Sequence, residues 1–139
     1  MDRKNFIGGS DAVKIMNAEG YELWQVKMGL KEPEDLSSIL AVQLGTYTEQ
    51  FNLRWFEVNT DQTVDSRQMV FKNKISGVPY KGTIDGMVGS SIIEAKHTFQ
   101  NNKMEDVLTQ YMPQIQLYMM LSESPACFLS VIFGNGRWD

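Results

Sequence analysis

One stretch in the second half of the chain decides the fold: Gly82-Thr83-Ile84-Asp85-Gly86-Met87-Val88-Gly89-Ser90-Ser91-Ile92-Ile93-Glu94-Ala95-Lys96. Residues 82–88 and 92–96 have the composition of short strands, and the Gly-Ser-Ser between them is typical of a turn. Because side chains on a strand alternate between its faces, Glu94 and Lys96 should point the same way. Ile93 and Ala95 should then point into the core. If the two strands pair, Asp85 reaches the same face as Glu94.

Two carboxylates and an ammonium group would therefore converge at one point. Oxygen ligands suit Mg²⁺, which keeps several waters and shares phosphate oxygens. A lysine beside a metal-bound water can orient that water or help to deprotonate it, so the set suits phosphodiester hydrolysis. The acid-x-Lys spacing alone arises about once per chain by chance, and Asp2-Arg3-Lys4 also matches it. A solvated hairpin with a weak surface salt bridge is the alternative interpretation.

The segments around this stretch predict helices packed on a small sheet. The expected helices lie at 10–20, with Ser10 as N-cap and Gly20 as stop, at 21–28, at about 38–58, and at 104–121 with a break or kink near Pro113. Further strands are expected at 63–71 and 126–133, the second an apolar run typical of a strand buried on both faces. This order predicts an α/β fold of mixed α+β character, with a short mixed central sheet flanked by helices.

Composition narrows the class of protein. The 139 residues suit one domain over 1–139, and 42% hydrophobic with 22% charged residues is ordinary for a globular protein. One cysteine, Cys127 in an apolar run, excludes an internal disulfide framework and predicts a buried thiol in a reducing compartment. One His and one Cys exclude a zinc site built from those ligands. We expect no signal peptide and no membrane span. A net charge of −4 excludes a uniformly basic surface, but not a local basic groove.

Short motifs lie along nearly the whole chain in a specific order. They are Arg3, Ile7-Gly8-Gly9-Ser10-Asp11-Ala12, Leu23-Trp24, Lys27-x-Gly29, Leu44-Gly45, Glu49, Gly82-Thr83-Ile84-Asp85-Gly86, Ile93-Glu94-Ala95-Lys96 and Tyr111-x-x-Gln114-Ile115-Gln116-Leu117-Tyr118-Met119. With this order and spacing, the chain resembles the PD-(D/E)XK nucleases, and among them the group of phage lambda exonuclease and the YqaJ-like viral recombinases. The resemblance implies a restriction-endonuclease-like core.

The resemblance also implies a role for each acidic and basic residue of the motifs. Asp85 and Glu94 would be the main metal ligands, helped by the carbonyl of Ala95. Lys96 would be the catalytic lysine. Glu49, on the helix facing the sheet, would complete the metal shell; without the family match it is as readily a solvated helix residue.

Two glutamines and two N-terminal residues complete the implied site. Gln114 matches the family's glutamine on the helix after the catalytic strand, and Gln116 is its rival as a substrate-contacting residue. A helical wheel favours Gln114, which shares a face with Tyr111 and Tyr118. Arg3 and Ser10 resemble residues that hold a 5′-phosphate. Ser10 at a helix start can bind phosphate on physical grounds, although it is more often only a cap, and Asp11 would repel the phosphate unless it turns to solvent.

We therefore expect hydrolysis of DNA phosphodiesters with Mg²⁺, for which Mn²⁺ can substitute. The expected activity is a 5′→3′ exonuclease on double-stranded ends in phage-type recombination, in the cytoplasm of a bacterial host. An endonuclease of the same superfamily, restriction-like or junction-cutting, is the first alternative, and a non-catalytic DNA-end-binding accessory domain is the second. Besides DNA, an annealing protein and further copies of the chain are open as partners. Because the family's enzymes continue further than residue 139, a ring-shaped trimer and processivity do not follow from the resemblance.

Overall fold

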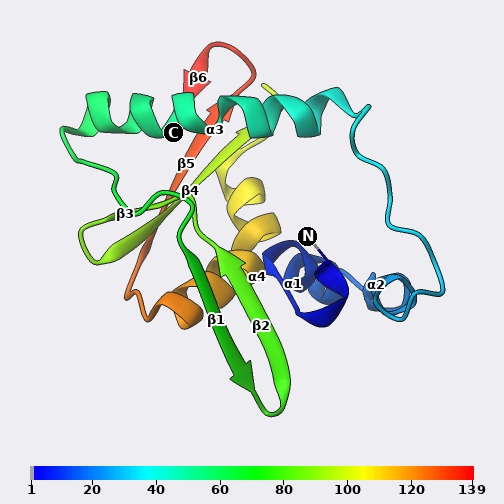
Figure 1. Ribbon diagram of the computed structural model, residues 1–139. Coiled ribbons are helices and arrows are strands. Elements are labelled where there is room, and N and C mark those ends of the chain that lie inside the picture. Colours follow the sequence, from blue (N-terminus) through cyan, green and yellow to red (C-terminus); the bar gives the residue numbers. More distant parts are fainter. Residues whose placement is uncertain (1) are drawn as a thin grey trace.

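The computed structural model describes residues 2–139 (Figure 1). Its elements in chain order are a 3-10 turn η1 (Arg3–Asn5), α1 (Gly9–Met16), α2 (Gly20–Lys27), α3 (Leu40–Thr60), β1 (Val70–Ile75), β2 (Val78–Thr83), β3 (Gly86–Val88), β4 (Ser91–Thr98), α4 (Met104–Ser122), β5 (Cys127–Phe133) and β6 (Arg137–Trp138). This confirms the predicted mixed α/β class with a short mixed sheet flanked by helices. No helix in the described part of the chain has the length and apolarity that a bilayer span requires.

The sheet has four strands in the order β3-β4-β5-β6, and β1 and β2 form a separate antiparallel hairpin. Only β4 and β5 are parallel, so the chain must cross over between them, and α4 makes this crossover. The β3–β4 pairing sets Gly86 opposite Ile93, as the hairpin prediction required.

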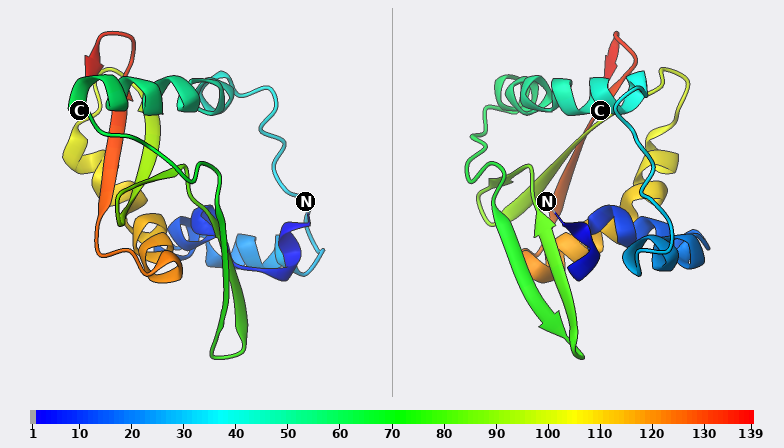
Figure 2. Two further views of the ribbon diagram at one scale, coloured as in Figure 1. Left: turned by 60° about the vertical axis from the view of Figure 1, so that its left-hand side comes forward. Right: turned by 45° about the vertical axis from the view of Figure 1, so that its right-hand side comes forward.

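The alternation of side chains along β4 sorts the core into two layers. Ile93 packs with Leu53 and Phe56 of α3, whereas Ile92 packs with Leu117 of α4. Helices therefore cover both faces of β4, with α3 and α4 on opposite sides of the sheet (Figure 2). Neither isoleucine has any exposed surface, so β4 is buried on both faces at this point.

The N-terminal helices differ from the prediction at their ends. Gly8, not Ser10, is the N-cap of α1, because the Asp11 side chain accepts a 2.9 Å hydrogen bond from the Gly8 N–H. Gly20 does not stop this helix, which already ends at Met16; it begins α2. The Asp11 side chain, at the third position of the helix, thus caps the N-terminus of α1 by binding the N–H of the N-cap residue.

The predicted strands shift for a physical reason. Residues 63–69 are irregular, apart from a bridge between Asp65 and Met87, and β1 begins only at Val70. Ser66 and Gln68 have φ values of 51° and 58°, which break the alternation of a strand. The expected strand over 82–88 is likewise split between β2 and β3, and the first four residues of β2 and all of β6 were not predicted.

The C-terminal half follows the prediction more closely. α4 continues through Pro113, and its ribbon changes direction between the two halves of the helix (Figure 2). β5 is buried on both faces only towards its end, because Phe128 near its start is 38% exposed. Cys127 is half-buried rather than fully buried, and burial raises the pKa of its thiol to about 12.

One buried amide ties α3 to the two central strands. The Asn52 side chain is 1% exposed, and its Nδ2 donates to the carbonyls of Lys96 and Ser130 at 3.1 and 3.0 Å. The Ser130 hydroxyl donates back to Asn52 Oδ1 at 2.6 Å and accepts from the Trp138 indole N–H at 2.8 Å. These hydrogen bonds fix the position of β4 relative to α3, and therefore also the position of the Lys96 backbone.

We expect Asn52→Ala to lower the free energy of unfolding by about 2–4 kcal/mol, because it leaves buried carbonyls and a hydroxyl without their partner. Urea denaturation at fixed pH measures this change. Asn59→Ala is the matched control, since its amide bonds the Trp55 carbonyl on the exposed side of the same helix. Equal losses in the two variants would contradict the role given to Asn52.

Candidate active site

The pairing of β3 with β4 brings two carboxylates together. Asp85 lies directly before β3, and Glu94 lies in the middle of β4. Asp85 Oδ2 accepts a 2.7 Å hydrogen bond from the Ala95 N–H, which anchors the carboxylate to the neighbouring strand. Glu94 is 1% exposed and Asp85 9%. The convergence expected from strand alternation is therefore present in the folded chain.

Both acids hold protons more tightly than usual. Burial is the largest cause and raises the pKa of Glu94 to about 8, with the nearby Asp85 carboxylate adding to the effect. Burial also raises the pKa of Asp85 to about 6, against the Ala95 hydrogen bond, which lowers it. The charged forms need a further positive charge to be stable here.

Lys96 lies on the same face of β4 as Glu94. Its Nζ is 3.8 Å from Glu94 Oε2 and donates to Gln114 Oε1 at 3.3 Å. The ammonium also sits over the ring of Tyr111, 4.3 Å from its centroid. Gln116 is exposed and contacts only Met112 Sδ, so α4 brings Gln114 rather than Gln116 to the lysine.

The donor atoms fit a divalent cation. Glu94 Oε1 is buried and has no hydrogen-bond partner among the described residues, so one ligand position is left unsatisfied. Asp85 supplies a second carboxylate, and oxygen donors of this kind suit Mg²⁺. Within residues 2–139 no three His, Cys, Asp or Glu side chains cluster as a complete metal site. Glu49 stands near enough to raise the pKa of both acids, but its Oε1 accepts from Gln68 Nε2 at 2.5 Å.

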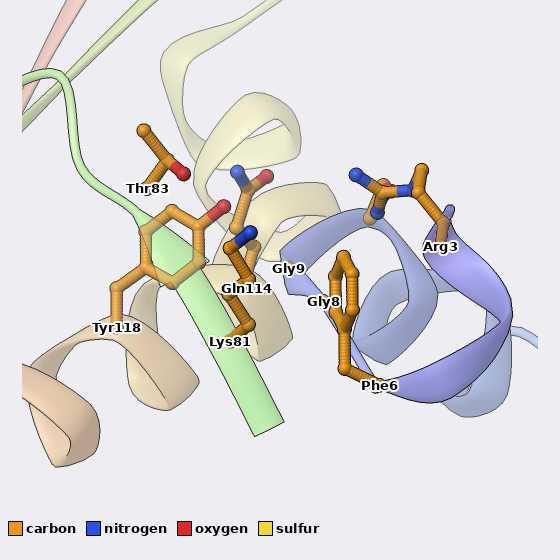
Figure 3. Close-up of a pocket in the computed structure, with 9 residues that line it drawn as sticks. Arg3, Phe6, Gly8, Gly9, Lys81, Thr83, Gln114 and Tyr118 are labelled. Carbon is orange, nitrogen blue, oxygen red and sulfur yellow. The ribbon is translucent and has the colours of Figure 1, made fainter. Parts of the chain in front are cut away.

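A second feature adjoins this site on the other side of Gln114. A pocket of about 160 Å³ is lined by residues from three parts of the chain: Arg3, Phe6, Gly8, Gly9, Ser10, Lys81, Thr83, Gln114 and Tyr118 (Figure 3). Arg3 Nη2 donates to Ser10 Oγ at 3.2 Å, so the two residues paired by the sequence analysis meet. The lining of the pocket includes two basic side chains, Arg3 and Lys81.

Asp11 does not turn to solvent as the sequence analysis required. It is 4% exposed, and its Oδ2 lies 2.8 Å from Lys27 Nζ and 3.8 Å from Arg3 Nη2. Lys27 also donates to the carbonyls of Arg3 and Phe6, which ties the N-terminal segment to α2. The charge of Asp11 is thus compensated from within, and its repulsion of an anion in the pocket is reduced.

Sequence reasoning missed Lys81, Thr83 and Tyr118 as pocket residues. Lys81 and Thr83 precede Asp85 at intervals of two, a spacing that could have placed them on its side of the chain. The sequence analysis also gave no reason why residue 9 must be glycine. A Cβ there would meet Tyr118 Oη at 2.5 Å and Gln114 Cγ at 2.7 Å, so only glycine lets α1 approach α4 this closely.

A larger cleft of about 1110 Å³ runs past the lysine between α3 and the start of α4. Glu49, Lys96, His97 and Tyr111 are among its lining residues. The His97 ring is held on both sides, by Thr48 Oγ1 at 3.0 Å and by the Gly134 carbonyl at 2.6 Å. These two contacts fix the ring in the wall of the cleft.

The model of the YqaJ-like viral recombinase domain matches residues 1–125 of the chain. Among solved structures, an alkaline exonuclease from Laribacter hongkongensis aligns with a TM-score of 0.71 and 17% identity, over 97% of this chain and 73% of that one. The same enzyme in complex with dAMP aligns at 0.68 and 18%, with the same coverage. A candidate exonuclease from Eubacterium rectale aligns at 0.66 and 13%, over 98% and 71%. A comparison with curated protein sequences finds no match.

We expect Glu94→Gln to raise the melting temperature of the metal-free protein at pH 8, because the variant need not bury a carboxylate charge. In the parent, the raised pKa of Glu94 means that the folded state holds its proton more tightly than the unfolded state. Stability should therefore fall as pH rises between the ordinary value of 4.5 and about 8, and the advantage of the variant should grow over this window.

Thermal melts in EDTA and in Mn²⁺ measure both the pH effect and metal binding. Mn²⁺ should raise the melting temperature of the parent but not that of Glu94→Gln. Glu34→Gln, in an exposed loop, is the control and should behave like the parent in both buffers. A parent protein that does not respond to Mn²⁺ would contradict the metal site.

Proposed function

This chain belongs to the family of YqaJ-like viral recombinase domains, and on that basis we propose that it is a metal-dependent 5′→3′ exonuclease acting on the ends of double-stranded DNA. One observation carries the proposal: a buried carboxylate pair, Asp85 and Glu94, with Lys96 Nζ 3.8 Å from Glu94. Two adjacent buried acids are rare where they have no functional role, because the charged forms are costly to bury.

In this proposal Asp85 and Glu94 hold Mg²⁺ or Mn²⁺, together with the carbonyl of Ala95, and Glu49 adjusts the charge around them. The metal, when bound, supplies Lewis acidity for phosphodiester hydrolysis. Lys96 orients the attacking water and stabilises negative charge that builds on the phosphate. Gln114 accepts a hydrogen bond from Lys96 and so fixes the direction of its ammonium group.

The small pocket supports cutting from an end rather than within a strand. Arg3 and Lys81 supply positive charge, and Ser10 and Thr83 supply hydroxyls. These groups suit a terminal phosphate. Gln114 lines the pocket and also accepts a hydrogen bond from Lys96. A phosphate held in the pocket would therefore be separated from the proposed catalytic lysine by one side chain.

The alternatives account for less. An endonuclease would not need a pocket for a terminal phosphate beside the acids. A decayed accessory domain would not be expected to keep Lys96 against both Glu94 and Gln114, beside the buried Asp85. The Laribacter relative is an exonuclease and was solved with dAMP, a nucleoside monophosphate of the kind that exonucleases release. An annealing protein as partner and the cytoplasm of a phage's host as location stay predictions from the family.

We expect the protein to degrade linear duplex DNA in Mg²⁺ and to leave closed circular duplex intact. Lys96→Ala should abolish cleavage while keeping the Mn²⁺-dependent rise in melting temperature, because the lysine does not bind the metal. Gln114→Ala should reduce the rate by about tenfold or more. Gln116→Ala is its control, two residues away and exposed, and should retain the parent rate. Cutting of circular DNA would instead favour the endonuclease alternative.

We also expect 5′-phosphorylated ends to be digested faster than 5′-hydroxyl ends. A charge-assisted hydrogen bond of about 1.5–3 kcal/mol corresponds to roughly ten- to hundredfold discrimination, and the neighbouring Asp11 favours the lower limit. Arg3→Ala should reduce this preference while slowing digestion of hydroxyl ends little. Initial rates on matched duplexes test it, with Lys4→Ala as the control for charge near the N-terminus. Equal rates on both ends in the parent would contradict the pocket's assignment.

A further inference from the structure

One aromatic ring in the larger cleft is not used to pack the fold. Phe99 directly follows β4, three residues after Lys96, and is 71% exposed. It lines the cleft together with Lys96 and Tyr111. Among the described residues, Phe99 belongs to no buried core cluster and to no aromatic pair. Single exposed rings are common on protein surfaces, so the surroundings of Phe99 decide whether it has a role.

The backbone that carries Phe99 is firmly held. Arg137 Nη2 donates to the carbonyl of Gln100 at 3.1 Å and to that of Asn102 at 2.7 Å. The Asn102 N–H donates to the Phe99 carbonyl at 3.1 Å, which closes the turn after β4. This segment is therefore ordered before any ligand arrives, so less conformational entropy would be lost when a ligand packs on the ring.

The lining of the cleft suits unpaired bases better than phosphates. Lys96 is the one Lys or Arg among the described residues that line it, and Glu49 adds a negative charge. A strand held mainly by its phosphates would need several basic side chains. Four lining side chains are instead amides, which can both donate and accept hydrogen bonds at base edges: Gln100, Asn102, Gln110 and Asn135.

Of the two rings that line the cleft, Phe99 is the one open to a base. The Lys96 ammonium already stands over the ring of Tyr111, 4.3 Å from its centroid. The exposed ring of Phe99 has no cation–π partner among the described residues. Aromatic side chains of this kind are the platforms on which successive bases of a single strand stack.

We propose that Phe99 is a substrate-binding residue on which a base of the cut DNA strand stacks, on the 3′ side of the cleaved bond. This inference rests on the proposed function. Gln114 lines the small pocket and accepts from Lys96, which in turn lines the cleft. A strand with its 5′-phosphate in the pocket would pass the acids and continue into the cleft. Every base has an aromatic face, so Phe99 would hold any sequence, as successive removal of nucleotides requires.

The affinity for a 5′-phosphorylated single-stranded oligonucleotide tests the stacking. Lys96→Ala in Mn²⁺ is the common background, because it should keep the metal without cutting the probe. In this background Phe99→Leu should weaken binding by about tenfold, the loss of one base–aromatic stack, and Phe99→Trp should restore it. Tyr21→Leu is the matched control: Tyr21 is 72% exposed but does not line the cleft, and its loss should leave the affinity unchanged. Equal affinities with and without the Phe99 ring overturn the inference.

Abasic probes separate stacking from any effect of the substitution on the fold. One base at a time is removed from the oligonucleotide, while its phosphates stay. At one position the removal should weaken binding to the chain with Phe99 by about tenfold and have little further effect on Phe99→Leu. The melting temperature of Phe99→Leu should match that of its background, because the ring is exposed. Equal losses in both chains at every position overturn the inference, and would favour an apolar group of a protein as the occupant.

Failure of this inference can be told apart from failure of the proposed function. With Lys96 in place, Phe99→Leu should raise KM on linear duplex DNA by about tenfold and change kcat little, since stacking holds the ground state and the transition state alike. A chain that cuts DNA with the same KM whether or not Phe99 is present overturns the stacking alone. A chain that does not cut, but binds the oligonucleotide through Phe99, overturns the nuclease proposal and supports strand binding in the cleft.

Discussion

The burial of two carboxylates side by side is the constraint on which the rest of this structure depends. Asp85 and Glu94 are stable next to each other only because the Ala95 N–H binds one and the Lys96 ammonium stands near the other. The strands must therefore hold their register, and Asn52 helps to fix β4 from the far side of the sheet. The buried acids cost stability at this point, which is a common compromise at functional sites.

A single helix face connects the two halves of the site. Tyr111, Gln114 and Tyr118 lie one turn apart on α4, and they meet Lys96, the small pocket and the glycine of α1 in turn. Because α4 is also the crossover between the parallel strands, its position is set by the topology of the sheet. The small pocket and the buried acids therefore share the same supporting helix.

Short sequence patterns predicted the features that depend only on neighbouring residues. The alternation in residues 92–96 and the turn before it fixed which side chains share a face, and helical spacing chose Gln114 over Gln116. Long-range contacts were beyond these patterns: Lys81 and Thr83 reach the pocket only because Ile7 pairs with Tyr80. The positive φ values at Ser66 and Gln68 hid the true start of β1, since neither residue is one that normally marks such a conformation. The capping role of Asp11 was hidden because Ser10 looked like the better cap.

The small pocket draws its walls from opposite ends of the chain, and this has a consequence for protein synthesis. Arg3 and Ser10 leave the ribosome first, but Gln114 and Tyr118 follow more than a hundred residues later. A nascent chain therefore has no complete pocket until α4 has emerged, by which time Asp85, Glu94 and Lys96 have already been synthesised. Phosphate binding, as proposed here, would therefore become available only after the residues proposed to cut have been made.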